Sequence, residues 1–125
     1  MPELNPAGYR WLRARAYERW RYIAVLDPDG RELCRLDMNT DPRIARTIND
    51  GTGEIEIEVS LRGDDPEFVN RLPVRVAATC LFGAVEGGDY RSRVTYTPVA
   101  LAEPIDGVPL DHRCHIPVEL LSEVI

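Results

Sequence analysis

Hydrophobic and polar residues alternate along much of this chain, and this pattern predicts strands with one buried face. From Glu54 to Leu61 every second residue is aliphatic, and the residues between them are Glu or Ser. Such alternation is typical of a strand with one face in the core and the other in water. Residues 73–82 form a second strongly apolar segment. There we expect one face to carry Val74, Val76, Ala78, Cys80 and Phe82. We expect much of the other face to be covered too, since it holds Ala77, Thr79 and Leu81 beside Arg75.

Turn residues separate further expected strands. Asp27-Pro28-Asp29-Gly30 predicts a hairpin between strands 22–26 and 32–37, because Pro presets φ and Gly accepts a positive φ. We expect a strand over 91–97, which Pro98 ends or places at a sheet edge, with 99–102 as its continuation. Residues 43–48 fit either a short helical turn or an edge segment. We expect a short helix over 65–71, and loops over 83–89 and 103–111.

An N-terminal helix is predicted over residues 6–20. Asn5 is a good N-cap, and Pro6 is tolerated at the first helical position, where its missing N–H costs nothing. At helical spacing one apolar stripe would cover the sheet, and Trp11 would lie nearly opposite it. The stripe consists of Tyr9, Leu12, Ala16 and Trp20.

Together these elements predict one domain over residues 1–125, of the α+β class and mostly β. The N-terminal helix would pack on a small antiparallel sheet of about five or six strands, as a partly open barrel, with a β-sandwich as the alternative. Residues 21–116 would form the β-rich body. A short C-terminal helix is expected over 117–124.

Charge is distributed unevenly along the chain. It has 125 residues, and its 15 basic residues are all Arg, against 21 acidic residues, for a net charge of −6. Without Lys, a Walker A phosphate loop and Schiff-base chemistry are excluded within this chain. Residues 1–21 carry five Arg and two Glu, whereas the remainder carries ten Arg and 19 acidic residues. Such asymmetry indicates an interaction arm or association between opposite charges.

The N-terminal helix is therefore the candidate interaction site, because Arg and aromatic residues are enriched at interfaces. Our first hypothesis is a non-enzymatic assembly module that forms a homo-oligomer or binds a protein partner. The alternative is nucleic-acid binding, with Arg on phosphates and aromatic rings on bases, although the acidic remainder opposes a broad footprint. The candidate residues are Arg10, Trp11, Arg13, Arg15, Tyr17 and Arg19.

A third hypothesis, a small metal- or thiol-dependent enzyme, depends on the segment from Asp111 to His115. It holds His112, Cys114 and His115, whose imidazole and thiolate groups are ligands for transition metals. In a strand His112 and Cys114 would point to one side and His115 to the other. No further metal-binding motif completes the set. We therefore expect no cofactor, and favour a polar loop around one buried Cys.

Cysteine usage and segment lengths indicate the compartment. Cys34, Cys80 and Cys114 are odd in number and irregularly spaced, which does not match a disulfide framework. The first residues do not resemble a signal peptide, and no apolar stretch is long enough to span a bilayer. We expect a cytoplasmic protein without a membrane partner.

Overall fold

One helix precedes seven strands in this computed structural model, which describes residues 5–49 and 51–115. The elements are α1 (Pro6–Arg19), β1 (Tyr22–Leu26), β2 (Glu32–Asp37), β3 (Ile44–Asn49), β4 (Glu54–Arg62), β5 (Val74–Phe82), β6 (Ser92–Leu101) and β7 (Gly107–His115). The predicted C-terminal helix over 117–124 lies outside the described residues.

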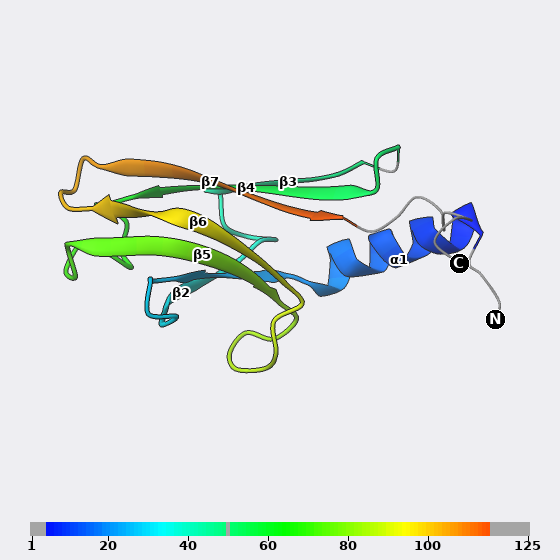
Figure 1. The fold of residues 1–125 in the computed structure, drawn as a ribbon, viewed down its shortest axis with the longest axis horizontal. Coiled ribbons are helices and arrows are strands. Elements are labelled where there is room, and N and C mark those ends of the chain that lie inside the picture. Colours follow the sequence, from blue (N-terminus) through cyan, green and yellow to red (C-terminus); the bar gives the residue numbers. More distant parts are fainter. Residues whose placement is uncertain (1–4, 50, 116–125) are drawn as a thin grey trace.

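The strands form two antiparallel sheets that face each other (Figure 1). One sheet has the order β2-β1-β5-β6 and the other has the order β3-β4-β7. The main core cluster draws aliphatic side chains from both sheets, such as Ile23 and Val25 from the first and Ile57 and Val59 from the second. The mostly β, α+β class is thus confirmed, with seven strands in two open sheets, which is the sandwich alternative.

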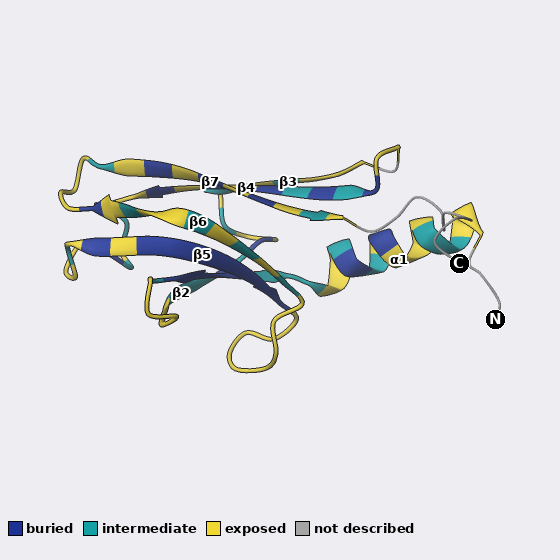
Figure 2. Cartoon of the chain, in the orientation of Figure 1, coloured by how far each residue is buried: buried dark blue, intermediate teal, exposed yellow. Residues whose placement is uncertain are grey.

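The strand with the clearest alternation behaves as predicted. In β4 the aliphatic residues from Ile55 to Leu61 are buried, and the Glu and Ser residues between them face outward; Figure 2 shows this alternation. The β1–β2 hairpin is confirmed as well. Gly30 has φ +83°, and Asp27 Oδ1 accepts hydrogen bonds from the backbone N–H groups of Asp29 and Arg31.

The predicted single face of β5 is wrong. The register with β6 shifts between Val76 and Ala78, so the strand changes which side it presents. Val74 and Val76 join the core between the sheets, whereas Ala78, Cys80 and Phe82 form a second cluster with Ala24 and Leu26. Both faces of β5 are consequently buried along most of its length.

Three expectations for the connecting segments are corrected or decided. Residues 65–71 form hydrogen-bonded turns instead of a helix, and these turns place Phe68 in the core. Residues 44–49 are strand β3, at the edge of the three-stranded sheet. The expected loop over 103–111 ends early, because β7 begins at Gly107 and pairs with β4 along its whole length.

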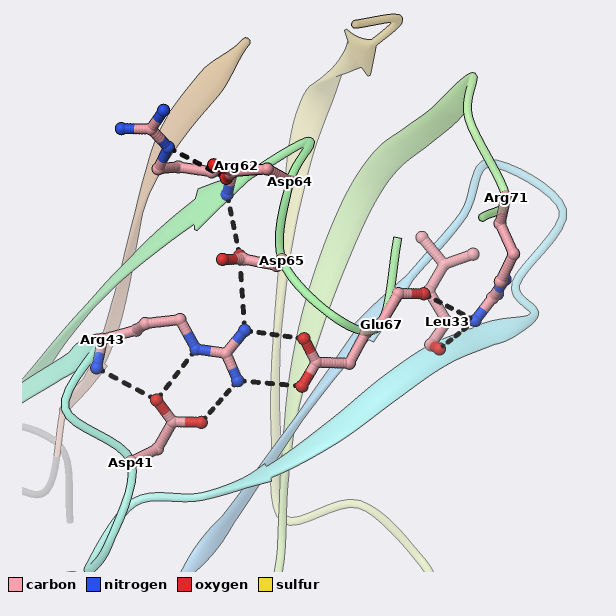
Figure 3. Close-up of polar contacts among 8 residues, drawn as sticks. All are labelled: Leu33, Asp41, Arg43, Arg62, Asp64, Asp65, Glu67 and Arg71. Atoms are coloured by element: carbon pink, nitrogen blue, oxygen red, sulfur yellow. Dashed lines mark hydrogen bonds and ion pairs between the residues drawn. The ribbon is translucent and has the colours of Figure 1, made fainter. Parts of the chain in front are cut away.

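Arg43 holds together two of the connections that pass between the sheets (Figure 3). It precedes β3, and its guanidinium contacts the neighbouring Asp41 at 2.6 Å and Glu67 at 2.7 Å, with Asp65 at 3.3 Å. Asp41 lies in the β2–β3 connection, whereas Asp65 and Glu67 lie in the β4–β5 connection. These hydrogen bonds from Arg43 lower the pKa values of Asp41 and Glu67.

Helix α1 extends from one end of the sandwich instead of covering a sheet (Figure 1). Its start is capped as predicted, because Asn5 Oδ1 accepts a hydrogen bond from the Gly8 N–H at 2.8 Å. The helix continues through Trp20 into β1, and its last turns lie against β3. Within residues 5–49 and 51–115 we find no helix of the length and apolar character that spanning a membrane requires.

Candidate interaction surface

Tyr17 and Arg46 fix the C-terminal half of α1 to β3. The Arg46 guanidinium stacks on the Tyr17 ring at 3.9 Å and donates a hydrogen bond to the Tyr17 carbonyl at 2.6 Å. In return the Tyr17 hydroxyl donates to the Arg46 carbonyl at 3.2 Å. Asn39 accepts a further hydrogen bond from Arg46. These contacts set the direction in which the helix leaves the sandwich.

The structure separates the six predicted interaction residues into two groups. Arg10, Trp11 and Arg19 are exposed, and Arg15 is half-buried beside Trp11, with its guanidinium 5.2 Å from the ring centroid. Arg13 is buried and Tyr17 packs against the core, so neither belongs to an exposed contact surface. Helical spacing predicted the exposure of Trp11 correctly, but it did not reveal the burial of Arg13.

The apolar stripe of the helix is open at Leu12, whereas Ala16 belongs to the core and Trp20 packs against it. Leu12 is 37% exposed, and it lies with Ala16 and Trp20 in a shallow, mainly apolar groove that Arg15 and Arg19 complete. We call these five residues the helix groove. Since Trp11 is 58% exposed next to it, the helix presents aromatic, aliphatic and cationic groups together.

A second feature of the surface lies on the outer side of the three-stranded sheet. Glu54, Glu56 and Glu58 point outward from β4, and Asp111 points outward from the paired strand β7. We call these four residues the acidic face. Arg113 lies among them, 3.8 Å from Glu54, 3.5 Å from Glu56 and 3.0 Å from Asp111. The Arg113 guanidinium thus lies within ion-pair distance of three of the four carboxylates.

The three candidate metal ligands do not converge. β7 is a strand rather than the expected loop, so His112 and Cys114 point inward while His115 points outward and donates to the Thr52 carbonyl at 3.1 Å. Among the described residues, no group of three His, Cys, Asp or Glu side chains is placed to share a metal ion.

His112 is instead the centre of a buried hydrogen-bond network between the sheets. Its Nδ1 lies 2.7 Å from Thr79 Oγ1, and its Nε2 lies 2.9 Å from Ser92 Oγ. Thr79 Oγ1 lies 2.8 Å from the Tyr96 hydroxyl, which donates to the Asp111 carbonyl. Because that carbonyl can only accept, the Tyr96 hydrogen is used there, and Thr79 must donate to the Tyr96 hydroxyl. Thr79 Oγ1 then accepts from His112 Nδ1–H, and Ser92 donates to the remaining nitrogen, Nε2.

This network contains a Ser–His pair that the sequence analysis missed. The only available signal was the spacing of Ser92 and Tyr96, which places both on one side of a strand. The alternation over 73–82 placed Thr79 opposite Ala78 and Cys80, and the register shift turns it toward His112. Burial lowers the pKa of His112 to about 4, so the imidazole is neutral and a weak base. Its Nδ1 partner is a hydroxyl instead of the carboxylate that orients the base in hydrolytic triads. The network is suited to joining β5, β6 and β7.

The cysteines also lack the environment of reactive thiols. All three are free, and burial raises the pKa of each, to about 12 for Cys34. A reactive thiol needs the opposite shift, because only the thiolate is a good nucleophile or metal ligand.

Comparisons with protein-family models, with curated proteins and with solved structures find no match to this chain. Its function therefore has to be argued from the helix groove, the acidic face and the buried network alone.

Proposed function

We propose that this protein is a non-enzymatic assembly module that associates with copies of itself, or with a protein partner, through helix α1. The observation that carries the proposal is the exposure of Trp11 beside an open helix groove. Trp and Arg supply much of the binding energy at protein interfaces. If the protein stayed monomeric, the Trp11 ring would remain in water and would contribute no burial energy. The groove adds the apolar surface that a partner would cover.

The remaining chemistry supports binding over catalysis. The three thiols have raised pKa values, and both ring nitrogens of His112 are engaged in hydrogen bonds. Free cysteines are typical of proteins in a reducing compartment, which supports a cytoplasmic location. For a nucleic-acid ligand the acidic face is a disadvantage, since it would repel phosphates near the helix.

The test compares Trp11→Ala with Tyr90→Ala, measuring mass by light scattering over a range of protein concentrations. Tyr90 is a matched control, because it is 54% exposed and lies in the β5–β6 loop, outside the helix groove. We expect the wild-type chain and Tyr90→Ala to associate alike. Trp11→Ala should need at least about tenfold more protein, because truncating a central interface Trp costs more than 1.4 kcal/mol.

Two results would overturn the proposal. If Trp11→Ala and wild type associate at the same concentrations, the helix is not the contact. If the wild type stays monomeric and retards single-stranded DNA with a steep salt dependence, nucleic-acid binding replaces assembly.

A further inference from the structure

We infer that the acidic face on β4 and β7 is the surface that receives helix α1 of a second copy of this chain. The inference rests on the proposed function and adds the partner and the docking site. Its first support is the complementary charge of two surfaces that the same chain carries.

The helix offers cations that form few ion pairs with the other described residues. Arg10 and Arg19 form no ion pair with another described residue, and Arg15 pairs only with its neighbour Glu18, at 3.6 Å. On the acidic face, Arg113 is the sole cation within ion-pair distance of Glu54, Glu56 or Asp111 in the described part of the chain. Each surface therefore has an excess of the charge that the other lacks.

The spacing of the charges also matches. Side chains four residues apart on a helix, such as Arg15 and Arg19, are separated by about 6 Å. Carboxylates two residues apart on a strand, such as Glu54 and Glu56, are separated by about 6.7 Å. Successive guanidinium groups can thus each meet one carboxylate, and Arg is suited to this because its planar fork binds a carboxylate with two hydrogen bonds.

The contact has to form between copies. Tyr17 and Arg46 fix the helix to β3, and the helix runs outward from the end of the sandwich (Figure 1). It cannot turn back onto the outer side of its own sheet while those contacts persist. Since the helix and the acidic face are different surfaces, repeated docking gives a ring or a filament, and mutual docking of two copies gives a dimer.

The experiment is a charge swap between two full-length variants. The helix-reversed variant carries Arg15→Glu and Arg19→Glu, and the face-reversed variant carries Glu54→Arg, Glu56→Arg and Glu58→Arg. Each variant alone should associate at least tenfold more weakly than wild type, because like charges then meet. Mixed in equal amounts they should associate again, since each helix now meets a face of opposite charge. Circular dichroism checks that each variant is folded. If the face-reversed variant is not folded, a variant with Glu54, Glu56 and Glu58 all changed to Gln replaces it. This neutralised face alone should also weaken association.

The outcomes separate the two proposals. If the helix-reversed variant loses association while both face variants associate like wild type, α1 mediates assembly but the acidic face is not its site, and the inference fails alone. If neither reversal weakens association, the proposed role of the helix fails as well. Recovery of association in the mixture supports both.

Discussion

At the scale of single residues, His112 is the group that should dominate the pH dependence of stability in weak acid. It is fully buried, and burial lowers its pKa from 6.5 to about 4, while the charge of Asp111 opposes this shift. The other groups in its network, Thr79, Ser92 and Tyr96, are uncharged at these pH values. Folding therefore requires a neutral imidazole that the unfolded chain would protonate.

We predict that the free energy of unfolding falls by about 3 kcal/mol between pH 6.5 and pH 4. In this range the unfolded chain binds a proton that the folded chain does not, so stability decreases as pH decreases. Urea denaturation at a series of pH values measures the change. His112→Asn keeps a polar partner for Thr79 and should lose most of this slope, although it lowers stability at pH 7. A variant slope equal to that of wild type would contradict the assignment.

Below the range of His112, the dependence of the free energy of unfolding on pH has a different cause. Arg21 donates two hydrogen bonds to Asp37 and holds the pKa of that carboxyl at about 2. The hydrogen bonds from Arg43 lower the pKa values of Asp41 and Glu67. Depressed carboxyl pKa values add stability that persists above the ordinary values and is lost as pH falls toward the folded-state values. These groups consequently act at lower pH than His112.

At the scale of elements, the connection between α1 and β3 determines whether the helix presents its groove in a fixed direction. Arg46 supplies most of that connection through Tyr17. We predict that Arg46→Ala accelerates amide hydrogen exchange in α1 by about tenfold or more, while exchange in β4 and β5 changes little, because local opening depends on local contacts.

Thr47→Ala is the control for that measurement. Thr47 follows Arg46 on β3 but pairs with Glu56 on the outer side, away from the helix. It should leave exchange in α1 unchanged. Equal acceleration of α1 and the core strands in Arg46→Ala would mean that the helix has no separate anchor.

Elements with strictly local signals could be predicted from the sequence. The alternation in β4, the turn at Asp27–Gly30 and the cap at Asn5 each involve neighbouring residues, and all three were predicted correctly. The face of β5 could not be predicted, because the register shift between Val76 and Ala78 depends on its pairing with β6. The strand β7 resembled a loop because Pro109 and Gly107 lie within it, at the edge of the three-stranded sheet.

The same distinction applies to the candidate site. Helical spacing was enough to place Trp11 away from the apolar stripe, and its exposure follows. The prediction that this stripe covers the sheet holds only at its C-terminal end, where Ala16 and Trp20 pack against the core. The helix direction is set by Tyr17 and Arg46, which are 29 residues apart. The alternation over Glu54–Leu61 already placed the three Glu residues of the acidic face on one outward side. Only Asp111 required the pairing of β4 with β7, which brings it beside Glu58. Long-range pairing of this kind leaves no trace in local spacing.

At the scale of the whole molecule, the two sheets are joined by three connections, and the connections contact one another. Arg43 links the β2–β3 connection to the β4–β5 connection (Figure 3). The β4–β5 connection then meets the β6–β7 connection, where Gly63 donates to the Asp106 carbonyl at 2.8 Å. A Cβ at Gly63 would overlap the Glu103 carbonyl, so the close approach requires glycine. These contacts join all three connections between the sheets.

We predict that Arg43→Ala lowers the free energy of unfolding by about 2 kcal/mol or more. Removing this cation leaves Asp41, Asp65 and Glu67 close together and mostly shielded from water, and unpaired buried charges are costly. The stability of Arg43→Lys should lie between those of wild type and Arg43→Ala, because Lys restores the charge without the planar fork.

Arg62→Ala is the control, since Arg62 pairs with Asp64 at the surface, and such pairs contribute about 0–1 kcal/mol. Urea denaturation at pH 7 measures all three. Equal losses for Arg43→Ala and Arg62→Ala would show that the cluster is an ordinary surface ion pair and that the sheets are held together by their core alone.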